Sequence, residues 1–343
     1  MSAPRATILG CSGADLTVDE RAFFRDADPL GFILFSRNID TPERARRLVD
    51  ELRTCVGRAE APVLVDQEGG RVARLRPPHW RKAPPAQVLG ALYERDPDRG
   101  LEATRLNSRL LAADVASIGC DVDCLPVLDI AFVEAHDVIG DRAYGATAGT
   151  VAALGRAAAE GLMAQGVMPV IKHVPGHGRA AVDSHHSLPR VEATREALES
   201  QDFLPFKLLS DLPWAMTAHV LYTAIDAEAA FTVSARGVQD VVRRHIGFDG
   251  LLLSDDLSMR ALGGSIGERA ASALGAGCDI ALHCNGQMDE MCQIASEVGA
   301  MGPASLRRFE AGRSQLARQR SPLDATGLAD AKERMSRLLP EWG

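Results

Sequence analysis

The stretch KHVPGHGRAAVDSHHSLP, residues 172–189, gathers more groups able to transfer protons than an ordinary loop. It holds one lysine, one aspartate and four histidines: Lys172, Asp183, His173, His177, His185 and His186. Histidine is the side chain whose usual pKa lies closest to neutral pH, so it often acts as a general acid or base. Asp183, two residues before His185, could orient that imidazole and stabilise its charged form.

The same stretch has no helical or strand period from Val174 to Val191. A structureless segment of this length inside a compact domain is usually functional or disordered. Gly176, Gly178 and the short side chains that follow indicate a mobile loop. We therefore expect a flexible segment over 174–191 that carries histidines to a site. A buried, hydrogen-bonded pair that only ends a strand is the alternative for Lys172 and His173.

Metal binding is a second interpretation of these histidines, because imidazole nitrogen is a common zinc ligand. Their spacings fit no helix, and the sequence has no early H-x-H motif of the kind found in metal-dependent barrel hydrolases. The seven cysteines contain no C-x-x-C pair, which indicates reduced, partly buried thiols. We expect no metal and no cofactor.

A second cluster, GFDGLLLSDDLSMRAL at residues 247–262, places two adjacent carboxylates directly after an apolar strand. Neighbouring side chains in a strand point to opposite sides, so only one of the two can face a site. Asp255, which ends the apolar run, is the better candidate, and Asp256 could serve a helix cap or a neighbouring backbone group. A purely structural helix start at 254–256 is the alternative.

Two further loops combine acids, glycines and arginines. VDQEGGRVARL, residues 65–75, carries Asp66, Arg71 and Arg74 around two glycines that permit a sharp turn. An aspartate and an arginine on one loop can grip vicinal hydroxyls by pairing an acceptor with a donor; a surface turn with a salt bridge is the alternative. DVIGDRAYG, residues 137–145, places Arg142 in a similar position after LPVLDI.

Eight apolar runs, each ending in a polar or glycine-containing turn, predict eight strands: residues 6–13, 30–38, 61–70, 120–130, 167–176, 214–222, 250–259 and 278–286. Apolar residues three and four apart predict amphipathic helices between them, at 17–27, 41–56, 149–166 and 234–247. Strands that are apolar almost throughout fit a parallel sheet covered by helices. The economical fold is an α/β (β/α)8 barrel of the TIM type; an open doubly wound sheet is less favoured because no G-x-G-x-x-G follows the first strand.

A barrel places its chemistry where strands end and the following loops begin. The residues at those positions are Asp66, Asp129, Lys172, His173, His219 and Asp255. We expect one domain over 1–343, with an amphipathic helical tail at roughly 303–343 on the outside of the barrel.

Composition limits the classes of partner that we expect the protein to bind. A formal charge of −8 and a pI near 5.6 argue against nucleic acid, which calls for a basic face. The N-terminus lacks a signal-peptide core, and the chain has no run of about 18 apolar residues. We therefore expect a cytoplasmic monomer with a small-molecule substrate and no membrane contact.

These motifs together resemble the family-3 glycoside hydrolases. KHVPGHG followed by DSH, with GFDGLLLSDDLSM, DQEGGRVARL, IGDRAYG and GFILFSRN, span residues 31–260 in the family's order. They are most similar to the single-domain bacterial β-N-acetylglucosaminidases of peptidoglycan recycling. The resemblance implies a retaining β-N-acetylhexosaminidase that removes a terminal, non-reducing N-acetylglucosamine from GlcNAc-anhydro-MurNAc muropeptides.

The resemblance also implies roles for individual residues. Asp255 would be the nucleophile, His185 the acid/base and Asp183 its partner. The positions that match sugar-binding residues of the family are Asp66, Arg74, Arg142, Lys172 and His173. A histidine acid/base departs from the pair of carboxylates that retaining glycosidases normally use.

Two other functions stay open at this point. An uncharged or cationic histidine does not repel phosphate, so a phosphorylase that resolves the same covalent intermediate with phosphate is one alternative. A sugar-binding barrel without catalytic activity is the other. Phosphate dependence of turnover would separate the first from a hydrolase, and binding without turnover would support the second.

Overall fold

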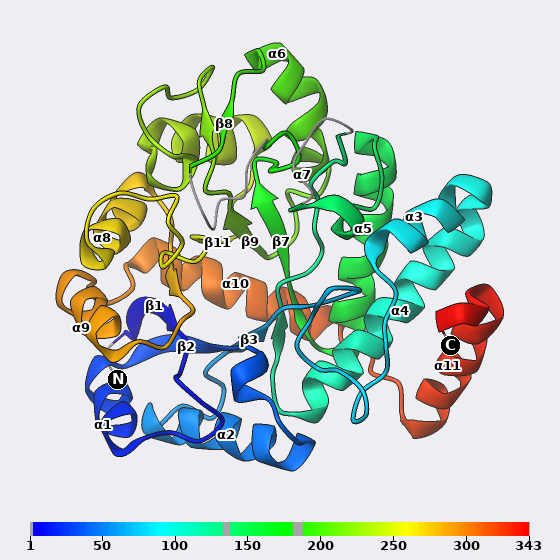
Figure 1. Ribbon diagram of the computed structural model, residues 1–343, viewed down its shortest axis with the longest axis horizontal. Helices are drawn as coiled ribbons and strands as arrows, with labels where there is room; N and C mark the ends of the chain where they lie inside the picture. The colour runs from blue at the N-terminus through cyan, green and yellow to red at the C-terminus, as the bar shows by residue number, and fades with distance from the viewer. Residues whose placement is uncertain (1–2, 133–137, 181–187, 343) are drawn as a thin grey trace.

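Eight parallel strands close into a barrel in the computed structural model, which describes residues 3–132, 138–180 and 188–342 (Figure 1). The strands of this sheet are β1 (Arg5–Leu9), β2 (Pro29–Leu34), β3 (Val63–Val65), β6 (Val122–Asp123), β7 (Met168–Val174), β9 (Trp214–Thr217), β11 (Leu251–Leu253) and β12 (Ala281–His283). The sheet has the order β11-β9-β7-β6-β3-β2-β1-β12, and a parallel bridge between Leu253 and Ile280 joins its two ends. The predicted barrel is confirmed, and the open doubly wound sheet is excluded because the strand order closes on itself.

Helices surround the barrel, as parallel strands require. They are α1 (Val18–Ala27), α2 (Pro42–Cys55), α3 (Ala86–Arg95), α4 (Pro97–Ser117), α5 (Ala148–Gln165), α6 (Arg195–Ala197), α7 (Leu204–Leu208), α8 (Ile266–Ala276), α9 (Met288–Glu297), α10 (Pro303–Gln319) and α11 (Ala325–Leu338). Two wider helical segments are η3 (Leu198–Asp202) and η5 (Gly237–Ile246), and short 3-10 turns are η1 (Ser36–Asn38), η2 (Gly140–Arg142), η4 (Phe231–Val233) and η6 (Pro340–Trp342). Of the helices in the described residues, none combines the length and the apolar character that a membrane span needs.

Local sequence explains where the helices begin. At the start of α1 the Thr17 side chain accepts from the backbone N–H of Glu20, and the Glu20 carboxylate accepts from the backbone N–H of Thr17. Ser265 and Glu268 repeat this reciprocal cap at the start of α8. Such pairs satisfy two N–H groups that the first helical turn leaves without partners. The four helices predicted from periodicity all appear within a few residues of their expected bounds.

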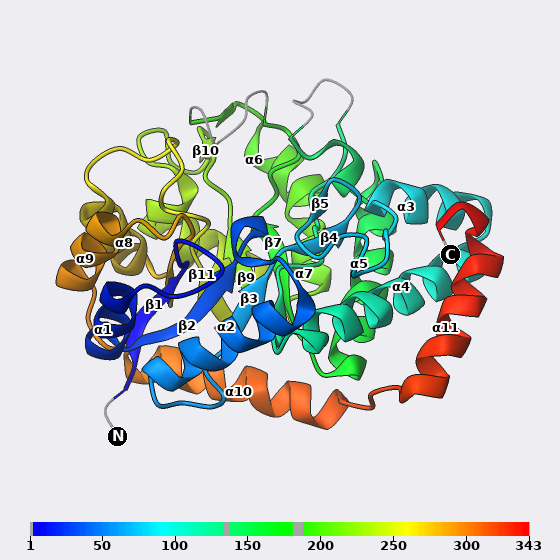
Figure 2. The same cartoon turned by 60° about the horizontal axis from the view of Figure 1, so that its bottom comes forward.

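Two small strand pairs lie beyond the carboxyl ends of the barrel strands (Figure 2). The hairpin of β4 (Gln67–Gly69) and β5 (Val72–Ala73) follows β3, and β8 (Arg190–Val191) pairs in parallel with β10 (Leu221–Tyr222). The expectation that 174–191 carries no strand is therefore wrong at both ends, because Val174 still belongs to β7 and Arg190–Val191 form β8. Two residues are too few to give a period in the sequence, and β8 forms only because β10 supplies its partner.

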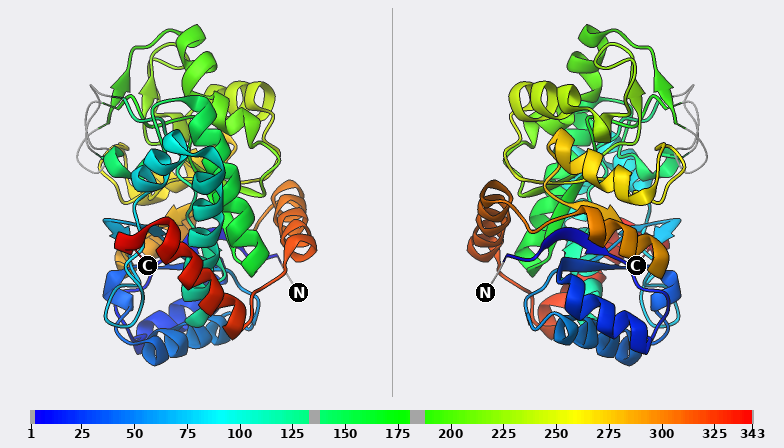
Figure 3. Two further views of the ribbon diagram at one scale, coloured as in Figure 1. Left: turned by 90° about the vertical axis from the view of Figure 1, so that its right-hand side faces the viewer. Right: turned by 90° about the vertical axis from the view of Figure 1, so that its left-hand side faces the viewer.

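The C-terminal helices cover the barrel from outside (Figure 3). Helix α10 crosses beneath the amino ends of the strands, where the rings of Phe309 and Trp214 lie 5.8 Å apart. Helix α11 packs against α4 on the flank. The amphipathic tail predicted for 303–343 is thus confirmed as helical and peripheral.

One buried carboxylate connects α10 to the place where β11 and β12 meet. Asp279, only 3% exposed, precedes β12. Its Oδ2 accepts from the backbone N–H of Leu252 and from Arg243, both at 2.9 Å, and its Oδ1 accepts from Ser305 and Arg308, at 2.6 and 3.0 Å. A single side chain therefore joins β11, η5 and α10.

Replacing Asp279 by asparagine is expected to lower the free energy of unfolding by about 3–5 kcal/mol, because the largely buried Arg243 loses its counter-charge and Arg308 loses the buried one of its two carboxylate partners. Chemical denaturation would measure the loss. Asp249→Asn is the matched control: this carboxylate also pairs with Arg308, but its side chain is 74% exposed, so the expected cost is below about 1 kcal/mol. Equal effects of the two substitutions would contradict the role given to Asp279.

Candidate active site

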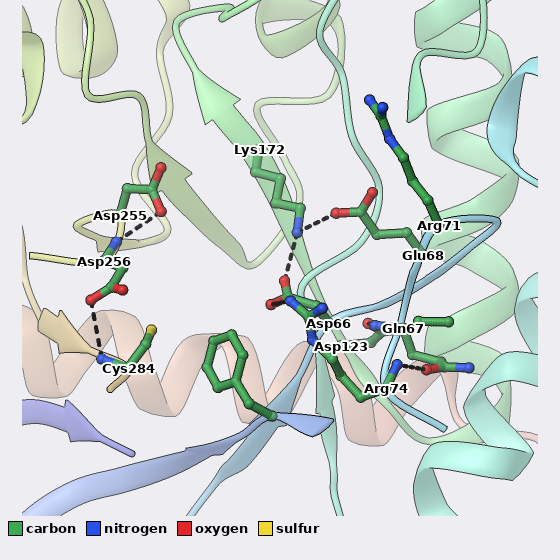
Figure 4. Close-up of polar contacts among 12 residues, drawn as sticks. Asp66, Gln67, Glu68, Arg71, Arg74, Asp123, Lys172, Asp255, Asp256 and Cys284 are labelled. Carbon is green, nitrogen blue, oxygen red and sulfur yellow. Dashed lines mark hydrogen bonds and ion pairs between the residues drawn. The ribbon is translucent and has the colours of Figure 1, made fainter. Parts of the chain in front are cut away.

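A pocket of about 160 Å³ opens at the carboxyl end of the barrel. Its lining includes six residues that the sequence analysis selected: Asp66, Arg74, Arg142, Lys172, His173 and Asp255. They come from the connection after β3 (Asp66, Arg74), the segment after β6 (Arg142), the end of β7 (Lys172, His173) and the segment after β11 (Asp255), and strand ends and the loops that follow them are the usual origin of a site in this fold. Figure 4 shows Asp255 and Asp256 on one side of the view and Lys172, Asp66 and Glu68 converging on the other.

Lys172, near the end of β7, is the centre of the charged group. Its side chain is 2% exposed, and Nζ donates to Asp66 Oδ1 at 2.8 Å and to Glu68 Oε1 at 2.6 Å. Burial alone would lower the pKa of Lys172, but the two carboxylates raise it above its usual value. The two carboxylates therefore favour the charged form of the lysine. Lys172 is a buried, hydrogen-bonded side chain near the end of β7, as the alternative interpretation had it, and it also lines the pocket.

Asp66 directly follows β3 and lies between two cations. Besides Lys172, it accepts from Arg74 Nη2 at 3.1 Å, so the loop holds the salt bridge of the alternative interpretation, but this salt bridge lines a pocket. Burial works against ionisation, but Lys172 and Arg74 hold the pKa of Asp66 well below its usual range. Its side chain remains 15% exposed, so the carboxylate still faces the pocket.

The β4–β5 hairpin brings Arg74 back toward Asp66. Gly69 and Gly70 have positive φ values of 97° and 55°, as the predicted sharp turn requires. The buried Gln67 side chain then accepts from the backbone N–H groups of Arg74 and Leu75 at 2.9 and 3.0 Å. This amide fixes the backbone at Arg74.

Glu68 is a site residue that the sequence analysis missed. Its carboxylate, 4% exposed, accepts from Arg142 Nε and Nη2 at 2.9 and 2.8 Å and from Lys172. Burial raises the pKa of Glu68, but Arg142 and Lys172 lower it to about 2. The signal was present: Glu68 stands two residues after Asp66, and alternate residues of an extended chain share a side.

Asp129 anchors the start of the histidine segment. Its Oδ1 accepts from the backbone N–H groups of His173 and His177 at 3.2 and 2.6 Å, and its Oδ2 lies 2.6 Å from His173 Nδ1. Burial opposes its charge, but contact with His173 and the N–H groups lowers the pKa of Asp129 to about 2. Because Nδ1 is engaged, the opposite ring nitrogen of His173 is the one available to the pocket.

Asp255 and Asp256 both line the pocket, so the expectation that only one of them faces it is wrong, but their carboxylates have different partners. Asp255 lines the pocket, and its Oδ1 accepts from the backbone N–H of Asp256 at 2.8 Å. Burial opposes its ionisation, but the imidazoles of His219 and His173 and this N–H hold the pKa of Asp255 below its usual value. The Asp256 carboxylate serves the backbone: it accepts from the N–H groups of Ser258 and Cys284 at 3.0 and 3.1 Å. The next helix begins only at Ile266, so the structural alternative of a helix start at 254–256 is wrong.

Other predicted positions have different outcomes. His219 is fully buried and bonded to Thr232 and to the backbone oxygen of Asp256. Asp183, His185 and His186 lie outside the described residues.

The part of the chain with described coordinates contains no group of three histidine, cysteine or acidic side chains arranged to hold a metal. All seven cysteines are free and five are buried, as the sequence predicted.

Comparison with known families decides where this chain belongs. The model of the glycosyl hydrolase family 3 N-terminal domain matches residues 15–314. The chain belongs to glycosyl hydrolase family 3. It is 40% identical over 282 residues to the β-hexosaminidase of Alkalilimnicola ehrlichii, covering 81% of this chain and 80% of that protein. It is 38% identical over 324 residues to the β-hexosaminidase of Chromobacterium violaceum, covering 92% and 89%.

Solved structures agree with these family-3 relatives. Native NagZ from Neisseria gonorrhoeae superposes with a TM-score of 0.87 at 30% identity, covering 98% of each chain. The same protein in complex with N-trifluoroacetyl-D-glucosamine gives a TM-score of 0.86 at 29% identity, covering 100% of this chain and 99% of that one. The predicted family and the prediction of a glycoside hydrolase of the β-hexosaminidase type are confirmed.

The lowered pKa of Glu68 gives a pH-dependent prediction. A carboxyl group with a lowered folded-state pKa stabilises the protein above its unfolded-state pKa of about 4.3, and this contribution is lost as the pH falls toward about 2. Glu68→Gln should therefore lower the free energy of unfolding most above about pH 5, and the gap from wild type should close on acidification. Urea denaturation at several pH values would measure this gap. The exposed Glu310 of α10 supplies the control Glu310→Gln, and a pH-independent gap for Glu68→Gln would contradict the assignment.

Proposed function

We propose that this family-3 enzyme is a retaining β-N-acetylhexosaminidase in which Asp255 is the nucleophile. The observation that carries the proposal is the position of Asp255: a carboxylate held ionised at the end of β11, in the same pocket as the Lys172 group. A nucleophilic carboxylate must be charged to attack. Of the adjacent pair, Asp256 is occupied by several backbone N–H groups, whereas Asp255 accepts from one. Asp66, Arg74, Arg142, Lys172 and His173 are proposed to hold the sugar.

The reaction then has two balanced steps. Asp255 Oδ attacks the anomeric carbon while the bond to the leaving oxygen breaks, and that oxygen takes a proton from the acid/base residue. Water next attacks the glycosyl–aspartate ester, gives its proton back to the same residue and releases the sugar with Asp255 regenerated. The anomeric configuration is retained because each step inverts it once.

The four described carboxyl groups that line the pocket are poorly suited to act as the acid. Asp66 and Glu68 have lowered pKa values because cations contact them, and Asp255 has a lowered pKa as well. Asp256 accepts from the backbone N–H groups of Ser258 and Cys284 and from the Ser258 hydroxyl. A histidine is then the natural group to hold a proton at neutral pH. Of the two that line the pocket, His173 is paired with Asp129, and burial lowers the pKa of His177 to about 4. This supports His185 as the acid/base, with Asp183 as its partner, as the resemblance implied.

The proposed sugar contacts follow from the remaining exposure of the charged group. Asp66 keeps pocket-facing surface and offers acceptor oxygens beside the N–H donors of Arg74 and Lys172, which suits a pair of neighbouring hydroxyls. Glu68 lies deeper and holds Lys172 and Arg142 in place.

The substrate class is proposed from the relatives. The Neisseria protein was solved with N-trifluoroacetyl-D-glucosamine, which supports an N-acylated glucosamine in the pocket. We infer that the natural substrates are peptidoglycan fragments ending in N-acetylglucosamine, such as GlcNAc-anhydro-MurNAc muropeptides. The single domain, the cytoplasmic location and the monomeric state remain predictions from the sequence.

Asp255→Asn tests the nucleophile. Hydrolysis of an aryl β-N-acetylglucosaminide in phosphate-free buffer should fall by at least about a thousandfold, because the amide cannot form the covalent ester. The exposed Asp330→Asn on α11 is the control and should match wild type. Wild-type turnover should not change with added phosphate or chelator. Turnover that requires phosphate would instead indicate a phosphorylase, and substantial activity of Asp255→Asn would exclude this residue as the nucleophile.

His185→Ala tests the acid/base with two leaving groups. A dinitrophenolate leaves without protonation, whereas methylumbelliferone or a sugar hydroxyl needs a proton. The loss of activity should therefore be at least about tenfold greater for the poorer leaving group. His186→Ala, at the next residue in the sequence, is the matched control and should show no such dependence. A leaving-group dependence that appears in His186→Ala instead would move the role to that imidazole.

A further inference from the structure

A chain of three buried side chains lies behind Asp255. Thr217 at the end of β9, His219 just after it and Thr232 in η4 are all fully buried. The Thr217 and Thr232 hydroxyl oxygens are 2.8 Å apart, and Thr232 Oγ1 is 2.7 Å from His219 Nδ1. Burying three polar side chains costs free energy unless each one is hydrogen-bonded, so the position of this set beside Asp255 calls for an explanation.

Both ends of this chain hold backbone next to Asp255. Thr217 Oγ1 accepts from the backbone N–H of Asp255 at 3.3 Å, and His219 Nε2 donates to the backbone oxygen of Asp256 at 3.0 Å. Between these points, the Asp256 N–H donates to Asp255 Oδ1 at 2.8 Å. The chain thus holds the backbone on both sides of the hydrogen bond from the Asp256 N–H to Asp255 Oδ1, and this bond orients the Asp255 carboxylate.

The hydrogen bond at one end of the chain fixes which nitrogen of His219 carries hydrogen. A carbonyl oxygen can only accept, so His219 carries hydrogen on Nε2. Burial lowers the pKa of His219, which favours the neutral ring. Thr232 has two acceptors within reach of its hydroxyl, His219 Nδ1 at 2.7 Å and the backbone oxygen of Ala218 at 3.1 Å. A hydroxyl oxygen has two lone pairs, so Thr217 can accept from the Asp255 N–H whichever way it bonds to Thr232.

We propose that Thr217, Thr232 and His219 form a positioning chain that holds the Asp255 carboxylate in its attacking orientation. The inference rests on the proposed function of Asp255 as the nucleophile. None of the three residues transfers a proton to substrate; they act through the backbone of Asp255 and Asp256. Attack requires the reacting atoms to approach at about 3–3.5 Å in line, and a misplacement of about 1 Å can cost on the order of a hundredfold in rate.

The anchoring is needed because little else holds this loop from the β9 side. Strand β11 ends at Leu253, and residues 254–262 form turns rather than a helix. Asp256 and Ser254 bond to β12, through the backbone N–H groups of Cys284 and Leu282. The positioning chain supplies the opposing connection, from β9 and η4, so the loop is held from both neighbours.

Thr232→Val tests the chain, because valine keeps the shape of threonine but can neither accept nor donate. The measured quantity is the rate at which a slow fluorinated N-acetylglucosaminyl fluoride forms its covalent adduct, followed by intact-protein mass. In this reaction the carboxylate displaces fluoride, so no acid is needed. The maximal labelling rate should fall by about tenfold to a hundredfold with little change in the concentration giving half that rate. Thr232→Ser, which keeps the hydroxyl, should retain most of the wild-type labelling rate.

Thr7→Val is the matched control. This buried threonine of β1 has no hydrogen-bond partner for its hydroxyl among the described residues, so the substitution should leave labelling unchanged. Thr217→Val provides a second variant if Thr232→Val fails to fold, and it should slow labelling in the same way. Wild-type labelling rates in folded Thr232→Val or Thr217→Val would overturn the inference.

Asp255→Asn separates this inference from the proposed function. If Asp255→Asn forms no adduct while Thr232→Val labels like wild type, only the positioning chain is wrong. If Asp255→Asn is labelled at the wild-type rate, the nucleophile assignment fails, and the positioning chain fails with it.

Discussion

The contact between β11 and β12 is where the barrel closes, and the catalytic arrangement depends on it. These strands share one isolated bridge, from Leu253 to Ile280, rather than a long ladder. Carboxylates supplement it at both ends: Asp279 bonds β11 to α10 below, and Asp256 bonds the loop after β11 to Cys284 above. Asp255 stands at the top of this seam. A carboxylate bonded to N–H groups tolerates little displacement, so the same interactions that close the barrel also place the proposed nucleophile.

Charge is distributed unevenly across the pocket. Three cations, Lys172, Arg74 and Arg142, pair with only two carboxylates, Asp66 and Glu68, so this side is cross-linked by ion pairs and keeps an excess of positive charge. The side that carries Asp255 has imidazoles and backbone N–H groups in place of full cations. The Asp255 carboxylate is therefore kept ionised without an ion pair to lysine or arginine among the described residues.

The sequence predicted the barrel and most of the pocket because both leave local marks. Apolar runs that end in charged residues indicate parallel strands with a site at their carboxyl ends, which placed Asp66, Lys172 and Asp255 correctly. Glu68 was missed because its importance comes from Arg142, 74 positions away in the chain. The partners of His219 were also hidden, since Thr232 lies in a turn without periodic pattern and reaches the site only through tertiary packing. Two-residue strands such as β8 depend on a partner in the same way.

The pairing of β1 with β12 has a consequence for how the molecule is made. Residues 5–9 cannot find their second neighbour until residues 281–283 have been synthesised, and α10, which holds Asp279 from below, comes later still. During translation the growing sheet therefore keeps an unpaired apolar edge at β1 until residues 281–283 of the 343 have been made. Contacts this distant in sequence also make folding slow. We expect this protein to depend on chaperones more than a helical protein of equal length.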